Sequence, residues 1–275
     1  MQLATVRRGD GTTAAVRTEG RWQALPATDL SAWYAAGAPL EPGEALGDVS
    51  FALPLPAPGK VICCGLNYAD HIRETGRELP AYPTLFSKYA DSLVGPTDDV
   101  VLPSGLQVDW EAELAVVVAT TMRGADRDTA LAGIAGYTVA NDVSVRDWQR
   151  RTTEWFQGKA WDASTPVGPV LVTPDEIDPI AGLVVTCRVN GEEMQCGDTA
   201  ELVFDAADLL AYVSTFTVLR PGDLVLTGTP GGVGVARDPQ RFLADGDVVE
   251  TEIAGIGTLL NRIRLTPPEG APHGT

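Results

Sequence analysis

The sequence has few cysteines, and their number and spacing exclude two classes of protein. None of the four cysteines among the 275 residues has a spacing to histidine that resembles a zinc site. A two-residue turn at Asn190-Gly191 would place Cys187 opposite Met194 and leave Cys196 diagonal at about 7 Å, beyond disulfide reach. We therefore expect four free thiols, and neither a disulfide scaffold nor a zinc protein.

Long apolar runs and an excess of positive charge are also missing. No run of about 18 apolar residues is present, and the first residues lack the apolar core of a signal peptide. Acidic residues outnumber lysine and arginine by 37 to 20, for a formal net charge of −17. Nucleic acid and anionic membranes bind clustered positive charge, so we expect neither as a partner. These features predict a globular cytoplasmic protein.

Lysine and histidine are scarce, whereas arginine is common. Of the 20 lysine and arginine residues, 17 are arginine, and the chain has two histidines. A compact ammonium aimed at one oxygen is not replaceable by a planar guanidinium, so each lysine is a candidate for chemistry. The three lysines are Lys60, Lys88 and Lys159. Of the two histidines, His273 lies in a C-terminal tail, residues 267–275, whose composition predicts disorder. His71 is thus the histidine left for the folded part.

Acidic side chains alternate in the segment 108–119, VDWEAELAVVVA, which we interpret as one strand. Residues two apart in a strand share a face, so the side chains of Glu111 and Glu113 project together about 6 to 7 Å apart. Asp142 follows a second β-rich run and could complete a site at the mouth of the sheet. Three carboxylates suit Mg²⁺, Mn²⁺ or Ca²⁺ better than zinc. The alternative is a solvated edge strand with ordinary surface charge.

His71 and Glu74 stand three residues apart, so on a helical turn they share a face. The carboxylate could then orient the imidazole as a general base. The alternative is an amphipathic surface helix closed by Gly76. The polar, glycine-punctuated stretch around residues 68–80 also has the composition of a mobile lid.

The order of turns, strands and prolines predicts two domains and a tail. Residues 1–55 form a small β-rich N-terminal domain, residues 56–266 the main domain, and residues 267–275 the disordered tail. Residues 29–37 have the pattern of a short capped helix that ends at glycine. The glycine-rich loop at residues 228–234 is either a carboxylate contact or a tight turn.

Eight ordered motifs between Lys60 and Leu265 resemble the fumarylacetoacetate hydrolase superfamily. The motifs are GLNYADHIRE, PTLFSK, VDWEAELAVVV, GYTVANDVSVRDWQ, QGKAWDASTPVGP, VNGE, GDLVLTGTPGGVG and GDVVETEIAGIGTLLNRI. The resemblance implies an α+β fold that is predominantly β, a mixed β-roll catalytic domain, and a homodimer. The branches that it suggests are acylpyruvate hydrolases, oxaloacetate decarboxylases and hydroxyheptadienedioate isomerases.

The resemblance also assigns roles to residues. It implies Mg²⁺ or Mn²⁺ on Glu111, Glu113 and Asp142, with Ca²⁺ able to replace either in a crystal. The implied catalytic residues are His71, Glu74, Lys159 and Gln149. The predicted substrate-binding residues are Phe86, Lys88, Arg146, Gly228 and Thr229.

The chemistry implied is cleavage of a C–C bond in an acylpyruvate or fumarylpyruvate-like 2,4-diketo acid. The enolate that forms would be stabilised by the metal, and water would be activated by His71 and Glu74. The small-molecule partner is thus an α-keto acid. The alternatives are an oxaloacetate decarboxylase, an isomerase or decarboxylase of aromatic meta-cleavage products, and an inactive metal-binding structural dimer.

Overall fold

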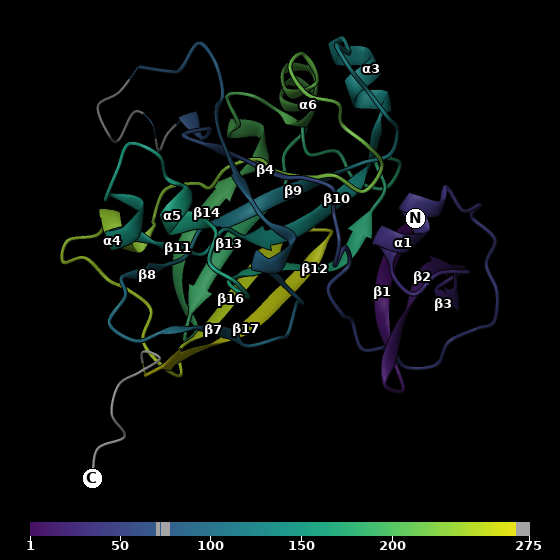
Figure 1. The fold of residues 1–275 in the computed structure, drawn as a ribbon, viewed down its shortest axis with the longest axis horizontal. Coiled ribbons are helices and arrows are strands. Elements are labelled where there is room, and N and C mark those ends of the chain that lie inside the picture. Colours follow the sequence, from purple (N-terminus) through teal and green to yellow (C-terminus); the bar gives the residue numbers. More distant parts are fainter. Residues whose placement is uncertain (70–71, 73–77, 268–275) are drawn as a thin grey trace.

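A mixed ten-stranded sheet forms the largest part of the computed structural model, which describes residues 1–69, 72 and 78–267 (Figure 1). The strand order is β3-β2-β1-β12-β10-β9-β15-β4-β5, with β6 pairing β12. Its strands are β1 Gln2–Arg8, β2 Gly11–Thr18, β3 Arg21–Ala24, β4 Val61–Gly65, β5 Thr84–Lys88, β6 Leu93–Val94, β9 Ala112–Val118, β10 Ile134–Asn141, β12 Thr165–Val172 and β15 Leu224–Leu226. The pairs β15–β4 and β12–β6 are parallel, and the others are antiparallel.

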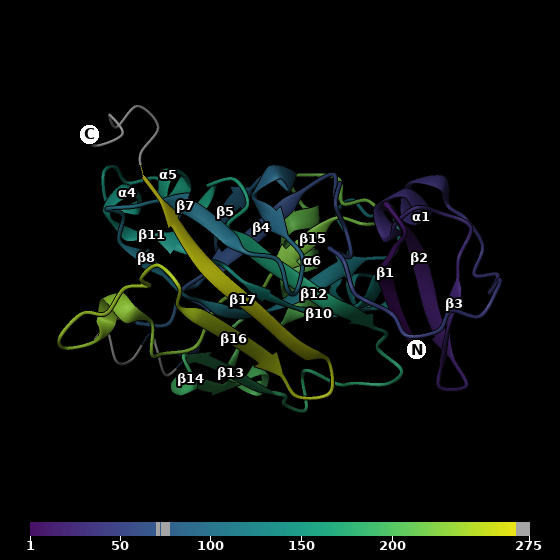
Figure 2. The same ribbon diagram turned by 90° about the horizontal axis from the view of Figure 1, so that it is seen from below.

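A second sheet of five strands runs in the order β14-β13-β16-β17-β7 (Figure 2). Its strands are β7 Val100–Pro103, β13 Val184–Val189, β14 Glu192–Asp198, β16 Val248–Ile253 and β17 Gly257–Thr266. Buried and less buried residues alternate along β16 and β17, as expected of a sheet with one face on the core. Two short strands, β8 Val108–Asp109 and β11 Ser144–Val145, form a separate pair.

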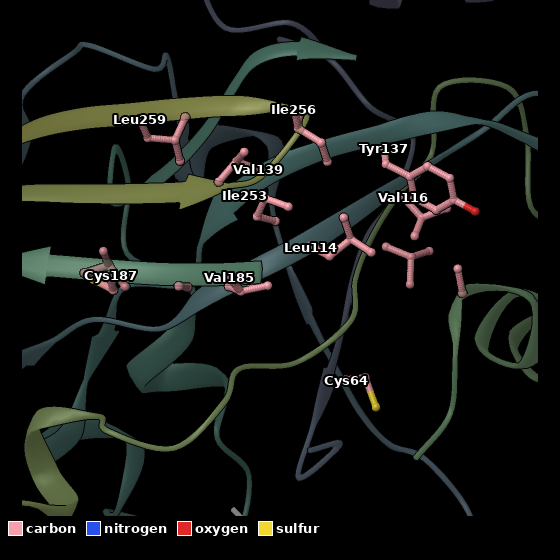
Figure 3. Close-up of a cluster of buried hydrophobic side chains, with 14 of the residues drawn as sticks. Cys64, Leu114, Val116, Tyr137, Val139, Val185, Cys187, Ile253, Ile256 and Leu259 are labelled. Carbon is pink, nitrogen blue, oxygen red and sulfur yellow. The ribbon is translucent and has the colours of Figure 1, made fainter. Parts of the chain in front are cut away.

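One of the two described clusters of buried hydrophobic side chains lies between these two sheets (Figure 3). Leu114 and Val116 of β9 and Tyr137 and Val139 of β10 belong to one buried cluster with side chains of the second sheet. The facing residues are Val185, Cys187, Ile253 and Leu259. β9 is buried along its whole length, so it is covered on both faces and is not the solvated edge strand that was the alternative.

Helices are short. They are α1 Leu30–Ala36, α3 Arg127–Ala132, α4 Arg146–Gln149, α5 Phe156–Lys159 and α6 Ala206–Ser214, with 3₁₀ turns at η1 Ala90–Ser92, η2 Thr199–Glu201 and η3 Gly234–Ala236. The predicted helix at 29–37 is confirmed, because Asp29 caps the N-terminus of α1 and Gly37 ends it with φ 56°. No described helix is long and apolar enough to cross a membrane.

The N-terminal unit and the short helices α4 and α5 lie at opposite ends of the molecule in both views (Figures 1 and 2). The unit is joined to the rest through the sheet, because β1 pairs with β12 at Gln2↔Val172 and Leu3↔Leu171. The predicted boundary near residue 55 stays a prediction. The α+β, mainly β fold expected from the sequence is confirmed.

Two local predictions were wrong, each because of a β irregularity. The segment 108–119 is two strands, since the chain leaves the ladder at Trp110 and Glu111. In the hairpin across Asn190-Gly191, a bulge after Cys187 pairs that residue with Gln195 instead of Met194. A bulge adds one residue to one strand and so shifts the facing partner, which a count of residues along the sequence cannot detect. All four cysteines are free, as predicted.

Candidate active site

The break between β8 and β9 brings Glu111 against the end of β10. The N–H of Glu111 donates to the side-chain oxygen of Asn141 at 3.0 Å, and the carbonyl of Glu111 accepts from the N–H of Asp142 at 2.8 Å. These bonds replace the ladder bonds that an uninterrupted strand would make. The interruption therefore places the acidic segment directly beside the aspartate that follows β10.

Glu111, Glu113 and Asp142 are all buried, and their carboxylate oxygens lie within 4.8 Å of one another. Glu113 lies in β9, Glu111 in the break just before it, and Asp142 directly after the neighbouring strand β10. Burial is costly for a charged group, so three carboxylates at this separation need compensating positive charge. Part of it comes from the protein itself.

Two of the three lysines meet at Asp142. The Nζ of Lys88 lies 2.7 Å from Asp142 Oδ1, and the Nζ of Lys159 lies 2.7 Å from Asp142 Oδ2 and 2.6 Å from Glu111 Oε2. Burial alone would raise the pKa of Asp142, but the two ammonium groups outweigh it and lower the pKa. Burial alone would lower the pKa of Lys159, but Asp142 and Glu111 raise it above its ordinary value. Lys159 is thus a permanent cation here.

Lys159 reaches this position because α5 packs very closely on α4. A Cβ on Gly158 would lie 2.5 Å from Cβ of Gln149, so no larger residue fits there without displacing one helix. The ammonium also lies 4.9 Å from the centroid of the Phe86 ring. This contact is within cation–π range.

A buried arginine completes the positive side of the site. Arg146 donates through Nε to Asp109 Oδ2 at 2.8 Å, and its Nη1 lies 2.7 Å from Glu111 Oε1 and 3.0 Å from Gln149 Oε1. Its Nη2 is buried and has no hydrogen-bond partner among the described residues. The pKa of Arg146 is raised because Glu111 and Asp109 outweigh burial, so this side chain is a cation too.

The glycine-rich loop binds carboxylates of the protein itself through its backbone. The N–H of Gly228 donates to Glu113 Oε2 at 2.7 Å. The N–H groups of Gly234 and Val235 donate to Asp109 at 2.7 and 3.0 Å. The backbone N–H groups of this loop therefore do bind carboxylates, but these carboxylates belong to Glu113 and Asp109 of the protein itself.

Glu113 differs from its neighbours because it has no ion pair among the described residues. Burial, followed by the charges of Asp142 and Glu111, raises the pKa of Glu113 well above its ordinary value. Four buried carboxylates here face only three buried cations; the carboxylates are Asp109, Glu111, Glu113 and Asp142, and the cations are Lys88, Arg146 and Lys159.

A divalent cation fits this imbalance. Each carboxylate oxygen has a second lone pair, so it can accept a hydrogen bond and still bind a metal. The all-oxygen donor set is that of Mg²⁺, Mn²⁺ or Ca²⁺. The described residues therefore suit the cation that the sequence predicted.

A cavity of about 580 Å³ opens beside these groups. It is lined by Cys64, Gly65, Leu66, Phe86, Glu111, Glu113, Arg146, Gln149, Arg150, Thr152, Thr153, Trp155, Lys159, Thr229, Val233, Val235 and Ala236. The volume is within the usual range of small-molecule sites. The cavity is therefore the candidate active site.

Most of the predicted site residues meet here. Glu111, Glu113, Phe86, Arg146, Gln149, Lys159 and Thr229 line the cavity. Lys88 is buried behind Asp142, where its Nζ also donates to Thr165 Oγ1 at 2.7 Å. Gly228 acts through its N–H on Glu113. His71 and Glu74 lie outside the described residues, so their assignment as a base pair stays a prediction.

Three residues that shape the site were not predicted from the sequence. Asp109 holds both Arg146 and the glycine-rich loop. Gln195, turned inward beside the hairpin bulge, accepts from Ala112 N at 2.9 Å and donates to Thr229 Oγ1 at 2.8 Å. Arg150 lines the cavity one helical turn after Arg146. Only Arg150 had a signal, the four-residue spacing from Arg146.

Comparison with known proteins agrees with this geometry. Residues 60–264 match the family model described as fumarylacetoacetate (FAA) hydrolase C-terminal. The chain is 48% identical over 219 residues to human "Oxaloacetate tautomerase FAHD2A, mitochondrial", which covers 78% of this chain and 70% of the relative. It is 45% identical over 215 residues to "2,4-didehydro-3-deoxy-L-rhamnonate hydrolase" of a Sphingomonas strain, covering 77% and 75% respectively.

A solved structure extends the similarity to the whole fold. The fumarylacetoacetate hydrolase of the psychrophilic Exiguobacterium antarcticum matches with a TM-score of 0.87 and 35% identity. The match covers 97% of this chain and 100% of that chain, so it includes the N-terminal unit that the family model leaves out.

Proposed function

The chain belongs to the fumarylacetoacetate hydrolase family of enzymes, and on that basis we propose that it interconverts the keto and enol forms of oxaloacetate. The sequence predicted a C–C hydrolase first and an oxaloacetate decarboxylase as an alternative. The proposed function is closer to the alternative, because both act on oxaloacetate. The name of the human relative supports the choice of substrate. The observation that carries the proposal is the Lys159 ammonium, fixed between Glu111 and Asp142 at the cavity wall.

Enolisation requires that C3 lose a proton while the C2 oxygen gains negative charge. Lys159 is a buried cation at the cavity and would stabilise that oxygen electrostatically. A divalent ion held by Glu111, Glu113 and Asp142 would add Lewis-acid stabilisation of the same charge. Arg146, with its unpaired Nη2, would orient a carboxylate of the substrate.

The proton from C3 needs a base. Among the described residues that line the cavity, Glu113 has a raised pKa, but we assign it to the divalent ion. Lys159 and Arg146 are cations, and Glu111 is paired with both. Burial and the charge of Glu113 raise the pKa of the Cys64 thiol to about 12. We therefore propose that His71, oriented by Glu74, accepts the C3 proton and returns a proton to the enolate oxygen.

The test is to follow the ketonisation of enol-oxaloacetate by ultraviolet absorbance with added Mg²⁺ or Mn²⁺. We expect the protein to accelerate it well above the uncatalysed rate, and Lys159→Ala to remove that acceleration. No acceleration with either ion would refute the proposal. Pyruvate release, measured in parallel, reports decarboxylation as the competing outcome.

Hydrolysis of a C–C bond in a 2,4-diketo acid is the second candidate. The cavity, at about 580 Å³, is larger than a four-carbon acid fills, and one relative is named as a hydrolase of a sugar-derived acid. The same cations would stabilise the enolate that leaves, and His71 would deprotonate water. Turnover of acylpyruvates with no effect on oxaloacetate would favour this candidate.

We propose two further properties, a homodimer and a cytoplasmic location. Exposed aromatic rings support the first: Tyr82 and Phe216 are 71% and 58% exposed, and each packs on Tyr212 with centroids 6.2 Å apart. Exposed apolar patches are common at subunit interfaces.

A further inference from the structure

Arg150 is a cation at the cavity that no described residue neutralises. It lines the same cavity as Lys159 and Arg146, but it is exposed, whereas both of those are buried. Its side chain has no hydrogen bond or ion pair with any residue in the described ranges. Arg146, in contrast, is engaged by Asp109, Glu111 and Gln149. A free guanidinium at a cavity wall is available for a ligand.

The backbone fixes where Arg150 lies relative to Arg146. The N–H of Arg150 donates to the carbonyl of Arg146 at 3.2 Å, which is the hydrogen bond of one helical turn at the end of α4. Residues four apart on a helix lie on the same face, so the two guanidinium groups follow one another along the wall. Arg146 is at the inner end beside the carboxylates, and Arg150 is nearer the mouth.

The charge of the site indicates what Arg150 would bind. Counted over the described residues, four buried carboxylates face three buried cations, so a bound divalent ion leaves one positive charge in excess. Arg150 raises that excess to two. A substrate with one carboxylate neutralises half of it, whereas a dicarboxylate neutralises all of it. The excess of positive charge therefore favours the dicarboxylate over the monocarboxylate.

We propose that Arg150 binds the second carboxylate of the substrate and so makes the enzyme selective for α-keto dicarboxylates. This inference rests on the proposed function, because it assigns the α-keto acid end to Lys159 and the acidic triad. The hydroxyl group of Thr153, which lines the cavity beside Arg150, can donate a hydrogen bond to the same group, whereas that of Thr152 already donates to the carbonyl of Glu154 at 3.1 Å. Arg150 is thus a specificity-determining residue at the mouth of the site.

Two ligands isolate this carboxylate. Oxaloacetate and 2-oxobutanoate share the α-keto acid and the four-carbon chain, and they differ in a carboxylate or a methyl group at C4. The experiment measures the KM of oxaloacetate and the inhibition constant of 2-oxobutanoate, with Mg²⁺ present, in the wild type, Arg150→Gln and Arg150→Lys. Because a hydrogen-bonded charge contributes strongly to affinity, we expect Arg150→Gln to weaken oxaloacetate by about tenfold or more. The inhibition constant of 2-oxobutanoate should change by less than about twofold, because this ligand has no carboxylate at C4 and its distant α-carboxylate is screened from Arg150 by solvent.

Arg151→Gln is the matched control. The Arg151 guanidinium lies 3.6 Å from the centroid of the Trp148 ring, and Arg151 is not among the residues that line the cavity. The variant loses the same charge from the same short segment, so it should leave both constants unchanged. Arg150→Lys, which keeps the charge but not the planar fork, should lie between Arg150→Gln and the wild type.

Three results would overturn the inference. They are equal losses for the two ligands in Arg150→Gln, no loss for either, and a wild type that binds both ligands equally. Titration calorimetry of the two ligands separates this inference from the proposed function. Binding of oxaloacetate that depends on Arg150, without turnover, would retain the dicarboxylate site and refute the tautomerase. Turnover of oxaloacetate that Arg150→Gln leaves unchanged would retain the tautomerase and refute the dicarboxylate site.

Discussion

The Nζ of Lys159 lies 2.7 Å from Oδ2 of Asp142, and both side chains are buried, with 2% and 0% of their surface exposed. An ion pair this deep is stabilising only when its geometry is good and its remaining hydrogen-bonding capacity is used. Further ion pairs support this one, since Lys88 lies 2.7 Å from the other oxygen of Asp142 and Lys159 also pairs with Glu111. Lysine has a flexible side chain, and these two carboxylates hold its ammonium in one place at the cavity wall.

The first prediction concerns the chemical identity of that cation. Lys159→Ala should remove turnover, and Lys159→Arg should not restore it, because a planar guanidinium cannot occupy the position of one ammonium between two carboxylates. Lys60→Arg is the control, since Lys60 pairs with Asp223 outside the cavity. Steady-state rates with oxaloacetate measure the effect. A fully active Lys159→Arg enzyme would contradict it.

The second prediction separates metal binding from stability. Glu113→Gln should weaken Mg²⁺ binding by at least about tenfold, because one of three charged ligands is lost. It should not lower the melting temperature of the metal-free protein, since Glu113 has no ion pair among the described residues and glutamine can still accept from Gly228. Titration calorimetry and thermal unfolding in EDTA measure the two effects.

Asp142→Asn is the comparison for Glu113→Gln. It should weaken Mg²⁺ binding too, but it should also destabilise the metal-free protein by about 3 to 5 kcal/mol, the usual cost of breaking a buried ion pair. Here Lys88 loses its ion pair, and Lys159 loses one of its two carboxylate partners. Equal melting temperatures for the two metal-free variants would show that the ion pairs of Asp142 do not stabilise the fold more than the carboxylate of Glu113 does.

The third prediction tests the base that the cavity lining requires. His71→Ala or Glu74→Ala should lower kcat for tautomerisation, and for hydrolysis of an acylpyruvate, by about 10² to 10⁴, the usual contribution of positioned acid–base catalysis. Decarboxylation of oxaloacetate should decline less, because its bond breaks without prior proton removal and Lys159 remains. Equal losses in all three reactions would mean that His71 is not the base.

The fourth prediction is a pH dependence of stability at a site remote from the cavity. Asp205 caps α6, and its carboxylate binds Arg127 of α3. Burial would raise the pKa of Asp205, but the hydrogen bonds from Arg127 and from backbone N–H groups lower it. A lowered pKa adds stability above the unfolded value of about 3.9, and that stability disappears as pH falls through the folded pKa.

Urea unfolding of two variants measures this contribution. Asp205→Ala should lose about 1 to 2 kcal/mol at pH 7, the usual value of an N-cap, and its difference from the wild type should shrink as pH falls below the unfolded pKa of about 3.9 and through the lowered folded pKa. Asp205→Asn keeps the cap and loses the charge, so its deficit should be smaller at pH 7. A difference that does not vary with pH would exclude the ion pair as its source.

The fifth prediction concerns assembly. Light scattering at micromolar concentration should give twice the chain mass of 29.0 kDa. If the exposed rings form the interface, Tyr82→Ser with Phe216→Ser should shift the protein toward monomer, because the buried apolar area is lost. A monomeric wild type would refute the dimer, and a dimeric double variant would place the interface elsewhere.

Part of the site could be predicted because its signals are local. The spacing of Glu111 and Glu113 before a run of apolar residues indicated a buried acidic strand, and Asp142 stood where the next strand ends. The scarcity of lysine marked all three lysines, of which Lys88 and Lys159 lie at the site, whereas Lys60 pairs with Asp223 outside the cavity. The family resemblance added the order of the motifs, and the structure brings most of these residues to one cavity.

The sequence by itself therefore determined the types of strand, the acidic triad and the lysines, since each depends on residue type and on spacing within a few positions. Only the tertiary structure decided which cation meets which carboxylate, that Asp109 and Gln195 support the site, and that Arg150 has no partner among the residues that the structure describes. The physical reason is that periodicity records the direction of a side chain relative to its own strand or helix. Which distant segment lies opposite depends on the break at Trp110, the bulge after Cys187 and the close contact at Gly158, and these arise when the sheets and helices pack.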